Sequence, residues 1–195
     1  MAIASHDIVT ATTYYDSPSK ANTAMTLSLA KKRSVELGIK TVVVATTSGD
    51  TAVKAAEAFP GYRVIGVSHA HGFKEPNVQE MTAANKAAFE AKGGIVLTTG
   101  HAFAGIGRAI RKRLNTYEAE EIVSHTLKMV MGQGIKVVCE IALMAADAGL
   151  VRTDEEVIAI AGTGHGADTA VVIKPANSSD FFDLRVKEII CKVRG

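Results

Sequence analysis

The sequence has no tryptophan, few other aromatic residues and only two cysteines among its 195 residues. Sparse aromatic side chains argue against a stacking surface for single-stranded nucleic acid. Neither cysteine belongs to a CxxC pair, and we find no signal peptide and no apolar run of about 18 residues that predicts a membrane-spanning helix. We therefore expect a cytoplasmic protein whose two thiols, Cys139 and Cys191, are buried as small apolar groups.

An excess of charge of one sign is also missing, because 22 lysines and arginines face 20 aspartates and glutamates. Such a balance provides no general attraction to nucleic acid or to an anionic membrane. Small molecules or further copies of the same chain are the expected partners. The length favours one domain covering residues 1–195.

Apolar, β-branched segments alternate with helical segments along most of the chain. Strands are predicted at residues 41–45, 63–68, 94–99 and 156–161, and helices at 22–37, 50–58, 76–91, 104–114, 118–131 and 135–148. We expect Asn22 to cap the first helix and Gly38 to end it. The alternation predicts an α/β fold, a three-layer α/β/α sandwich around a mostly parallel open sheet.

A last strand is predicted at residues 169–174, only seven residues after the strand at 156–161. Seven residues are too few for a helical crossover, so this strand should run antiparallel. Ligands of open α/β sheets bind outside the carboxyl ends of the parallel strands. We expect four loops to share that edge: Thr46–Thr51, Ser68–Gly72, Thr98–Gly105 and Gly162–Asp168.

The first of these loops has the composition of a phosphate site. It offers four hydroxyls, a glycine able to take a positive φ, and the free N–H groups of the helix that follows, in the series Thr46, Thr47, Ser48, Gly49, Asp50 and Thr51. The alternative is an ordinary turn in which Ser48 or Asp50 only caps the helix. Since a carboxylate repels a phosphate, Asp50 should point away, cap the helix or accept a ligand hydroxyl.

The last edge loop has three glycines in five residues, which allow a ligand to approach the backbone closely. Its candidate binding residues are Gly162, Thr163, Gly164, His165, Gly166 and Ala167. The alternative is a flexible hairpin. Its expected position opposite Thr46–Thr51 favours two loops around one phosphorylated ligand.

Four histidines also fall in the edge loops: His69, His71, His101 and His165. We expect such residues to donate hydrogen bonds to a phosphate or a ring, or to be solvated, and we include His101 in the candidate binding site. A metal site would require three loops to converge, and none is predicted. His101 or His165 could also serve as a general acid or base, but no catalytic residue is assigned.

Charged residues on the later helices admit two interpretations each. Arg108 shares a helical face with Arg111 and Lys112, which is typical of a solvated face, although its GxGR context could place it against a ligand. Glu140 and Asp147 share a face of a largely apolar helix, which indicates burial with a partner or a subunit contact. That helix, 135–148, could pack against a second copy in a homo-oligomer.

Several of these segments resemble the C-terminal α/β domain of pyruvate kinase. The family has a Thr-x-Ser-Gly-x-(Ser/Thr)-Ala phosphate loop after an apolar strand, and here Ala45-Thr-Thr-Ser-Gly-Asp-Thr-Ala52 and Val64-Ile-Gly-Val-Ser68 follow that order. The family's later effector loop and last strand are similar to Gly162-Thr-Gly-His-Gly166 and Thr169–Pro175. The resemblance covers residues 22–175, with an insertion-like helical stretch at 118–149.

The whole chain is also similar to a stand-alone family of small, mostly archaeal proteins of undefined function with this fold. The shared segments are Asn22-Thr23, Ser48-Gly-Asp-Thr51, Ala145-Ala-Asp147, Gly166-Ala-Asp-Thr-Ala-Val-Val-Ile173 and Phe181-Phe-Asp183. The resemblance implies a phosphorylated ligand, with flavin mononucleotide (FMN) a candidate cofactor. It does not imply kinase activity, because the catalytic machinery of pyruvate kinase lies in its barrel domain.

Asp50 stands where the effector loop of the enzyme often carries arginine, which argues against a sugar bisphosphate. The resulting prediction is a ligand-binding or sensory module for a phosphorylated or nucleotide-like small molecule. The alternative is an enzyme that uses the same site, for example a flavin-dependent oxidoreductase in which the cofactor supplies the chemistry. Fold alone decides neither, since doubly wound sheets host unrelated functions.

Overall fold

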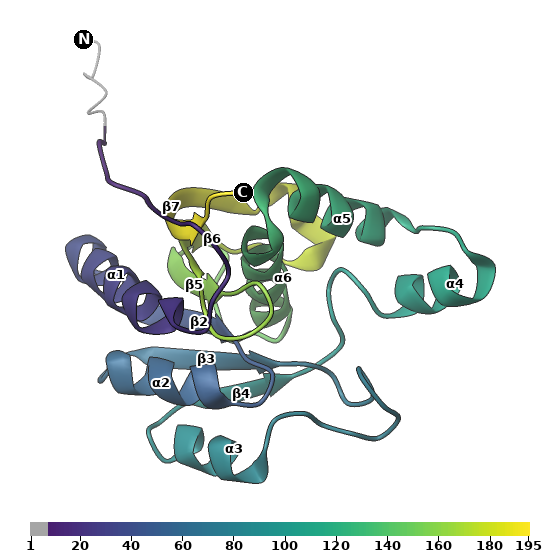
Figure 1. The fold of residues 1–195 in the computed structure, drawn as a ribbon, viewed down its shortest axis with the longest axis horizontal. Coiled ribbons are helices and arrows are strands. Elements are labelled where there is room, and N and C mark those ends of the chain that lie inside the picture. Colours follow the sequence, from purple (N-terminus) through teal and green to yellow (C-terminus); the bar gives the residue numbers. More distant parts are fainter. Residues whose placement is uncertain (1–7) are drawn as a thin grey trace.

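The computed structural model describes residues 8–195, and residues 1–7 of the predicted domain lie outside the described residues. The chain forms one seven-stranded sheet flanked by helices (Figure 1). The strands are β1 (Thr13–Tyr15), β2 (Thr41–Ala45), β3 (Arg63–Ser68), β4 (Ile95–Thr98), β5 (Val157–Ala161), β6 (Thr169–Lys174) and β7 (Arg185–Val193). The helices are α1 (Asn22–Leu37), α2 (Asp50–Ala58), α3 (Ala83–Glu90), α4 (Ile106–Leu114), α5 (Ala119–Met131) and α6 (Gln133–Asp147), with a 3₁₀ segment η1 (Ser178–Asp183).

The strand order is β1-β7-β6-β5-β2-β3-β4. Every neighbouring pair is parallel except β5–β6 and β6–β7, so β6 alone runs against the others. The predicted antiparallel strand at 169–174 is therefore confirmed. It is not the last strand, however, because β7 follows it and returns to the common direction.

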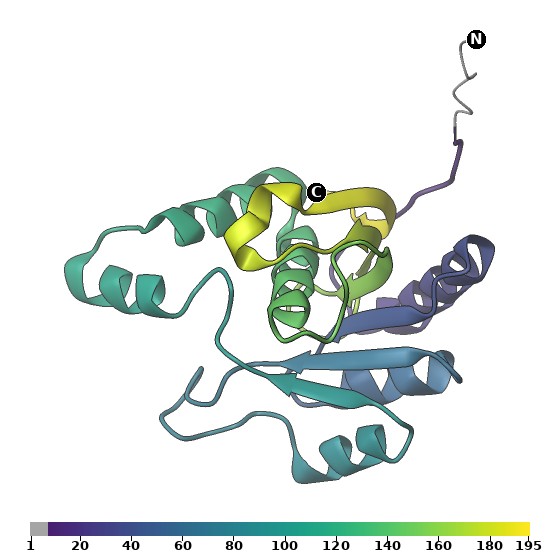
Figure 2. The same ribbon diagram turned by 180° about the vertical axis from the view of Figure 1, so that it is seen from behind.

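The helices cover the two faces of the sheet, which confirms the three-layer sandwich (Figures 1 and 2). On one face α1 and α2 pack on the sheet through a core that includes Leu27, Val44 and Ile160. On the other face α6 packs on β2, β5 and β6, and α5 packs on α6. The central strands, with both faces covered, are continuous apolar runs such as Val42–Val44, all fully buried.

Helix α6 is buried within its own chain along most of its length. Eleven of its fifteen residues are buried, including Val138, Cys139 and Leu143. Its apolar surface is thus already covered, and the predicted reason for its packing on a second copy is wrong. Cys139 and Cys191 are free and buried, as predicted. Burial raises the pKa of the Cys139 thiol to about 12.

Two predicted element boundaries are wrong for local reasons. The helix predicted at 76–91 begins at Ala83, because Asn77 has a φ of 63°, outside the helical region, and Thr82 caps α3 by accepting a hydrogen bond from the Asn85 N–H. Asn22 is the first residue of α1 and not its cap. Gly38 does end α1, with a φ of 71°.

Strand β7 was not predicted, because its first part carries the charged residues Arg185, Lys187 and Glu188 and has no continuous apolar run. Its charges are satisfied by the tertiary structure. The Arg33 guanidinium of α1 donates two hydrogen bonds of 2.7 Å to the Glu188 carboxylate. Beyond β7, the short β1 completes that end of the sheet.

Candidate functional site

The order in which the chain adds strands reverses between the neighbouring strands β2 and β5, and a pocket lies at this point. The chain leaves β2 towards β3 on one side, whereas β5 continues to β6 on the other. The loops that follow β2 and β5 therefore diverge at the carboxyl edge and leave room between them. A cavity of about 620 Å³ is lined there by parts of all four predicted edge loops and by α4, α5 and α6.

The Thr46–Thr51 turn is held in place by residues behind it. The Gly49 N–H donates to Thr46 Oγ1 at 3.1 Å, and the Ser48 carbonyl accepts from the Asn85 side chain at 2.9 Å and from the Thr82 N–H at 3.2 Å. Gly49 has a φ of 96°, and a Cβ on it would lie 2.5 Å from Asn85 Cβ. Only glycine fits this position, which fixes the entry into α2.

The donors of this turn that face the pocket are open. Thr47, Ser48 and Thr51 line the cavity, and their hydroxyls have no hydrogen-bond partner among residues 8–195. The N–H groups of Asp50, Thr51 and Ala52, in the first turn of α2, likewise have no acceptor in the described chain. The turn therefore presents hydroxyl and amide donors together at the positive end of a helix.

Asp50 is occupied by two lysines. Its Oδ2 lies 3.0 Å from Lys54 Nζ and 3.3 Å from Lys20 Nζ. These ammonium groups, Lys54 foremost, hold the pKa of the Asp50 carboxyl below its ordinary value. The carboxylate of Asp50 is thus turned to these two lysines, which balance its charge, an arrangement that differs from the three predicted ones.

The Gly162–Asp168 loop is fixed by a buried carboxylate. Asp168 accepts hydrogen bonds from the Thr163 N–H at 2.9 Å and from the Thr169 hydroxyl at 2.9 Å, and the Thr163 hydroxyl points at it from 3.4 Å. A Cβ on Gly162 would lie 2.3 Å from the Gly166 carbonyl oxygen. The loop is thus a compact turn and not a flexible hairpin.

The same loop is docked on the first turn of α1. The Ala167 N–H donates to Thr23 Oγ1 at 3.0 Å, and the Thr26 hydroxyl donates to the Ala167 carbonyl at 3.2 Å. These bonds join two of the segments that carry the resemblance to the stand-alone family, Asn22-Thr23 and Gly166-Ala167. Thr163 bonds to Asp168 and Ala167 bonds to α1, and neither lines the cavity. Its lining residues from this loop are Gly162, Gly164, His165 and Gly166.

Aromatic rings form another wall of the cavity. Phe73 stacks on His101 with ring centroids 4.7 Å apart and an interplanar angle of 15°. The guanidinium of Arg108 lies 4.3 Å from the Phe73 centroid on the same wall. Arg108 therefore lines the pocket, the position expected from its GxGR context.

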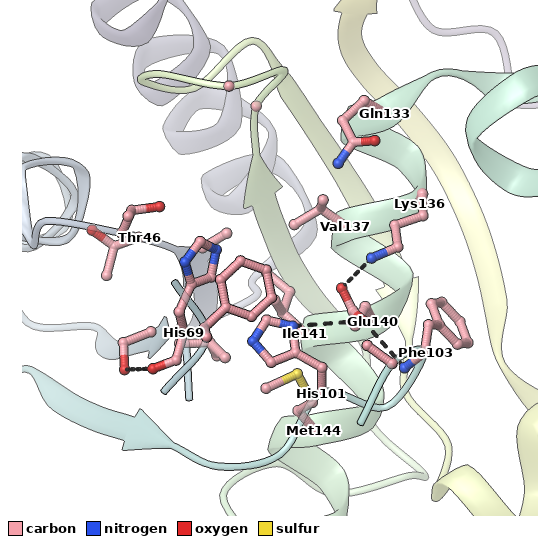
Figure 3. Close-up of a pocket in the computed structure, with 18 of the residues that line it drawn as sticks. Thr46, His69, His101, Phe103, Gln133, Lys136, Val137, Glu140, Ile141 and Met144 are labelled. Carbon is pink, nitrogen blue, oxygen red and sulfur yellow. Dashed lines mark hydrogen bonds and ion pairs between the residues drawn. The ribbon is translucent and has the colours of Figure 1, made fainter. Parts of the chain in front are cut away.

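His101 lies beside Glu140 of α6 (Figure 3). Glu140 is buried, accepts hydrogen bonds from Lys136 Nζ at 2.5 Å and from the Phe103 N–H at 3.1 Å, and lies 3.8 Å from His101 Nδ1. Burial is the main cause of a lowered pKa at His101, and the Glu140 charge opposes it. The sequence did not reveal this partner, although the Lys136 and Glu140 pair, four residues apart on an apolar helix, was the available signal.

Most of the predicted site residues meet in this cavity. Those that line it are Thr46, Thr47, Ser48, Asp50, Thr51, His101, Gly162, Gly164, His165 and Gly166. Gly49, Thr163 and Ala167 support the loops from behind. The sequence missed a further set of lining residues, foremost among them Lys20, Phe73, Phe103, Lys136 and Glu140. Asp147 is not part of the site, since it accepts hydrogen bonds from Asn177 and Ser178.

The described residues include neither a cluster of metal ligands nor a membrane-spanning helix. No group of three or more His, Cys, Asp or Glu side chains in residues 8–195 is arranged to hold a metal ion. No helix of that part of the chain is both long and apolar enough to cross a membrane.

The sheet and the cavity at the reversal of its strand order define an open α/β domain of the doubly wound class, with its pocket at the carboxyl edge. A family model described as "Pyruvate kinase, alpha/beta domain" matches residues 24–173. The chain belongs to this family, which confirms the resemblance found in the sequence.

Among solved structures, the chain is similar to pyruvate kinases from Cryptosporidium parvum. One is 12% identical over 78% of this chain with a TM-score of 0.40, and one in complex with ADP is 13% identical over 78% with a TM-score of 0.40. A third is 12% identical over 82% of this chain with a TM-score of 0.39. The chain spans between 22% and 23% of the length of these enzymes.

Proposed function

We propose that the pocket binds a phosphorylated small molecule, with the phosphate at the Thr46–Thr51 turn. The observation that carries the proposal is the group of open donors at the start of α2. Three hydroxyls and three N–H groups are without partners among residues 8–195, in a turn whose conformation is already fixed by Asn85 and Thr82. Such preorganised donors bind an anion without a cost of ordering the loop.

The charges around the cavity support an anionic ligand. Five cationic side chains line it, Lys20, Arg108, Arg111, Lys128 and Lys136, against the three carboxylates of Asp50, Glu121 and Glu140. The carboxylates pair with lysines or with Arg111. Arg108 and Lys128 have no acidic partner in the described chain, so they are free to neutralise a phosphate.

The aromatic wall supports a planar group next to the phosphate. Phe73 and His101 offer stacked rings, and an arginine such as Arg108 also packs on flat surfaces. A volume of about 620 Å³ is typical of a small-molecule site. FMN, with a phosphate and a flat ring system, fits this set of donors and rings and is our candidate ligand.

The test compares two hydroxyl substitutions by calorimetry with FMN and with inorganic phosphate as probes. Ser48→Ala combined with Thr51→Ala removes two open donors, and we expect an affinity about tenfold or more weaker for both probes, equivalent to about 1.4 kcal/mol. The matched control is Thr163→Ala, which removes a neighbouring hydroxyl that points at Asp168 and not at the cavity. Equal affinities of the double variant and the parent chain would remove the turn from consideration.

A second candidate function, a flavin-dependent oxidoreductase, rests on the same aromatic wall. In that case the flavin would supply the redox chemistry, and the chain would supply position and charge. Purified protein with a visible flavin absorption band would favour this candidate. A colourless protein that takes up no added FMN, yet binds inorganic phosphate, would exclude it and leave the phosphate site intact.

A further inference from the structure

A second histidine of the pocket, His69, has a carboxylate at one ring nitrogen and no partner among the described residues at the other. It follows β3 directly, and its Nδ1 lies 2.7 Å from Glu80 Oε2. Since a carboxylate only accepts hydrogen bonds, the proton between them belongs to Nδ1. In the neutral ring the lone pair is then on Nε2, which has no hydrogen-bond partner among residues 8–195.

The position of His69 is fixed on both sides of the residue. Its carbonyl accepts hydrogen bonds from Gln79 Nε2 at 2.8 Å and from the Ser68 hydroxyl at 3.2 Å. Its ring stacks near Phe73, with centroids 4.1 Å apart, and lines the cavity. In the view of Figure 3 the ring of His69 lies between Thr46 and His101, which also line the cavity. The carboxylate thus orients the imidazole while the backbone holds it at the ligand.

The other two histidines of the cavity lack this arrangement. His101 has neighbours at both ring nitrogens, with Glu140 3.8 Å from Nδ1 and the Ala70 N–H donating to Nε2 at 3.4 Å. His165 has no carboxylate partner among the described residues. Neither of the two residues that the sequence offered as an acid or base is therefore as well placed as His69.

We propose that His69 is a binding residue of the pocket and that its open Nε2 accepts a hydrogen bond from a hydroxyl group of the bound phosphorylated molecule. The proposal rests on the proposed phosphate site, since His69 and the Thr46–Thr51 turn line the same cavity. Glu80 acts as a positioning residue, because its carboxylate keeps the ring proton on Nδ1 and leaves Nε2 as the acceptor.

The first experiment is ¹⁵N NMR of the imidazole nitrogens in the full chain under conditions in which the rings are neutral. We expect His69 to carry its proton on Nδ1. In Glu80→Ala the two tautomers should both be populated, while Glu75→Ala, which removes a carboxylate from the same segment, should leave the parent spectrum. A parent chain whose neutral His69 carries its proton on Nε2 would overturn the proposal.

The second experiment uses 4-nitrophenyl acetate as a probe of the available base. Nε2 attacks the acetyl carbonyl, 4-nitrophenolate leaves, and water then cleaves the acetyl-imidazole to acetate. We expect His69→Gln to lose about tenfold or more of the rate and His125→Gln, outside the cavity, to keep it. Glu80→Ala should fall with His69→Gln, and inorganic phosphate should inhibit the parent chain.

The two proposals fail in different ways in this assay. An unchanged rate in His69→Gln, with phosphate still bound in calorimetry, would overturn the role of His69 and leave the phosphate site standing. Loss of the rate in His69→Gln without inhibition by phosphate would instead overturn the phosphate site, and with it the phosphorylated class of ligand.

Discussion

The two glycine-bearing loops of the pocket lie at the same edge of the sheet and differ in how they use their polar groups. In the Thr46–Thr51 turn, the hydroxyls of Thr47, Ser48 and Thr51 stay open towards the cavity. In the Gly162–Asp168 loop, the Thr163 N–H and hydroxyl are directed at Asp168. The first loop leaves its donors open to the cavity, whereas the second uses them to hold its own shape, so a glycine in a loop at the same edge does not mean an equal role.

The supports of the two loops differ as well. The turn after β2 is held from behind by Asn85, at the start of α3. The loop after β5 is held by Thr23, at the start of α1. Both supports come from helices on the same face of the sheet, α1 and α3, whereas α6, on the other face, contributes lining residues of the cavity. Substitutions can therefore separate the stability of a loop from its binding.

The largest expected effect is that of Gly162→Ala. A Cβ at Gly162 would lie 2.3 Å from the Gly166 carbonyl oxygen, and backbone cannot move aside easily. We expect the free energy of unfolding to fall by about 3 kcal/mol, measured by urea denaturation. Gly100→Ala is the matched control, since its Cβ would meet nothing within 4 Å. Equal stability of the two variants would show that the second loop is more plastic than its packing indicates.

A smaller effect is expected for Thr23→Val. The substitution removes the acceptor of the buried Ala167 N–H while keeping the shape of the side chain. We expect a loss of about 1–2 kcal/mol in the free energy of unfolding, because the N–H is left unsatisfied. Thr47→Val, in the other loop, should keep the stability and weaken only ligand affinity. If Thr47→Val were the less stable variant, the proposed division between the loops would be reversed.

The smallest effect is expected for Asp50→Asn. This half-exposed carboxylate pairs with Lys54 and Lys20, and exposed pairs contribute about 0.3–0.5 kcal/mol. Because its pKa is lowered in the folded chain, the contribution is present above the ordinary value of 3.8 and is lost as the pH falls through the folded pKa.

The check on Asp50→Asn is a pair of urea denaturation curves. The difference in stability between Asp50→Asn and the parent chain should be measurable at pH 7 and should diminish as the pH falls below 3.8. The variant should also bind inorganic phosphate more tightly, since one negative charge leaves the turn. Weaker binding by the variant would mean that Asp50 contacts the ligand directly.

Much of the central architecture was predictable because local signals agree there. Apolar β-branched runs marked β2, β3 and β5, and the short spacing before β6 predicted its antiparallel direction, as the structure confirms. Prediction failed where tertiary contacts decide. The charged β7 is a strand because the neighbouring β6 supplies its backbone partners and Arg33 neutralises Glu188.

The site was predictable to the same degree. Nine residues of two loops, together with His101, do line one cavity, because the carboxyl ends of parallel strands meet at one edge. The aromatic wall was missed except for His101 and for Arg108, which was given two interpretations, since Phe73 and Lys136 come from segments that no local pattern connects. The pair of His69 and Glu80 was hidden for a further reason: residues 76–82 were assigned to a helix, which the turn at Pro76 and Asn77 prevents.

By itself, the sequence determined the layered α/β fold, the edge at which a ligand would bind and the hydroxyl-rich turn, since each depends on residues close together in the chain. The tertiary structure alone decided which hydroxyls stay open, which cations face the cavity and which histidine has a carboxylate behind it. Those properties depend on contacts between segments far apart in the chain, as the hydrogen bond between Thr23 and Ala167 spans 144 residues. Backbone patterns have a local period, whereas the partner of a buried polar group is chosen by the fold.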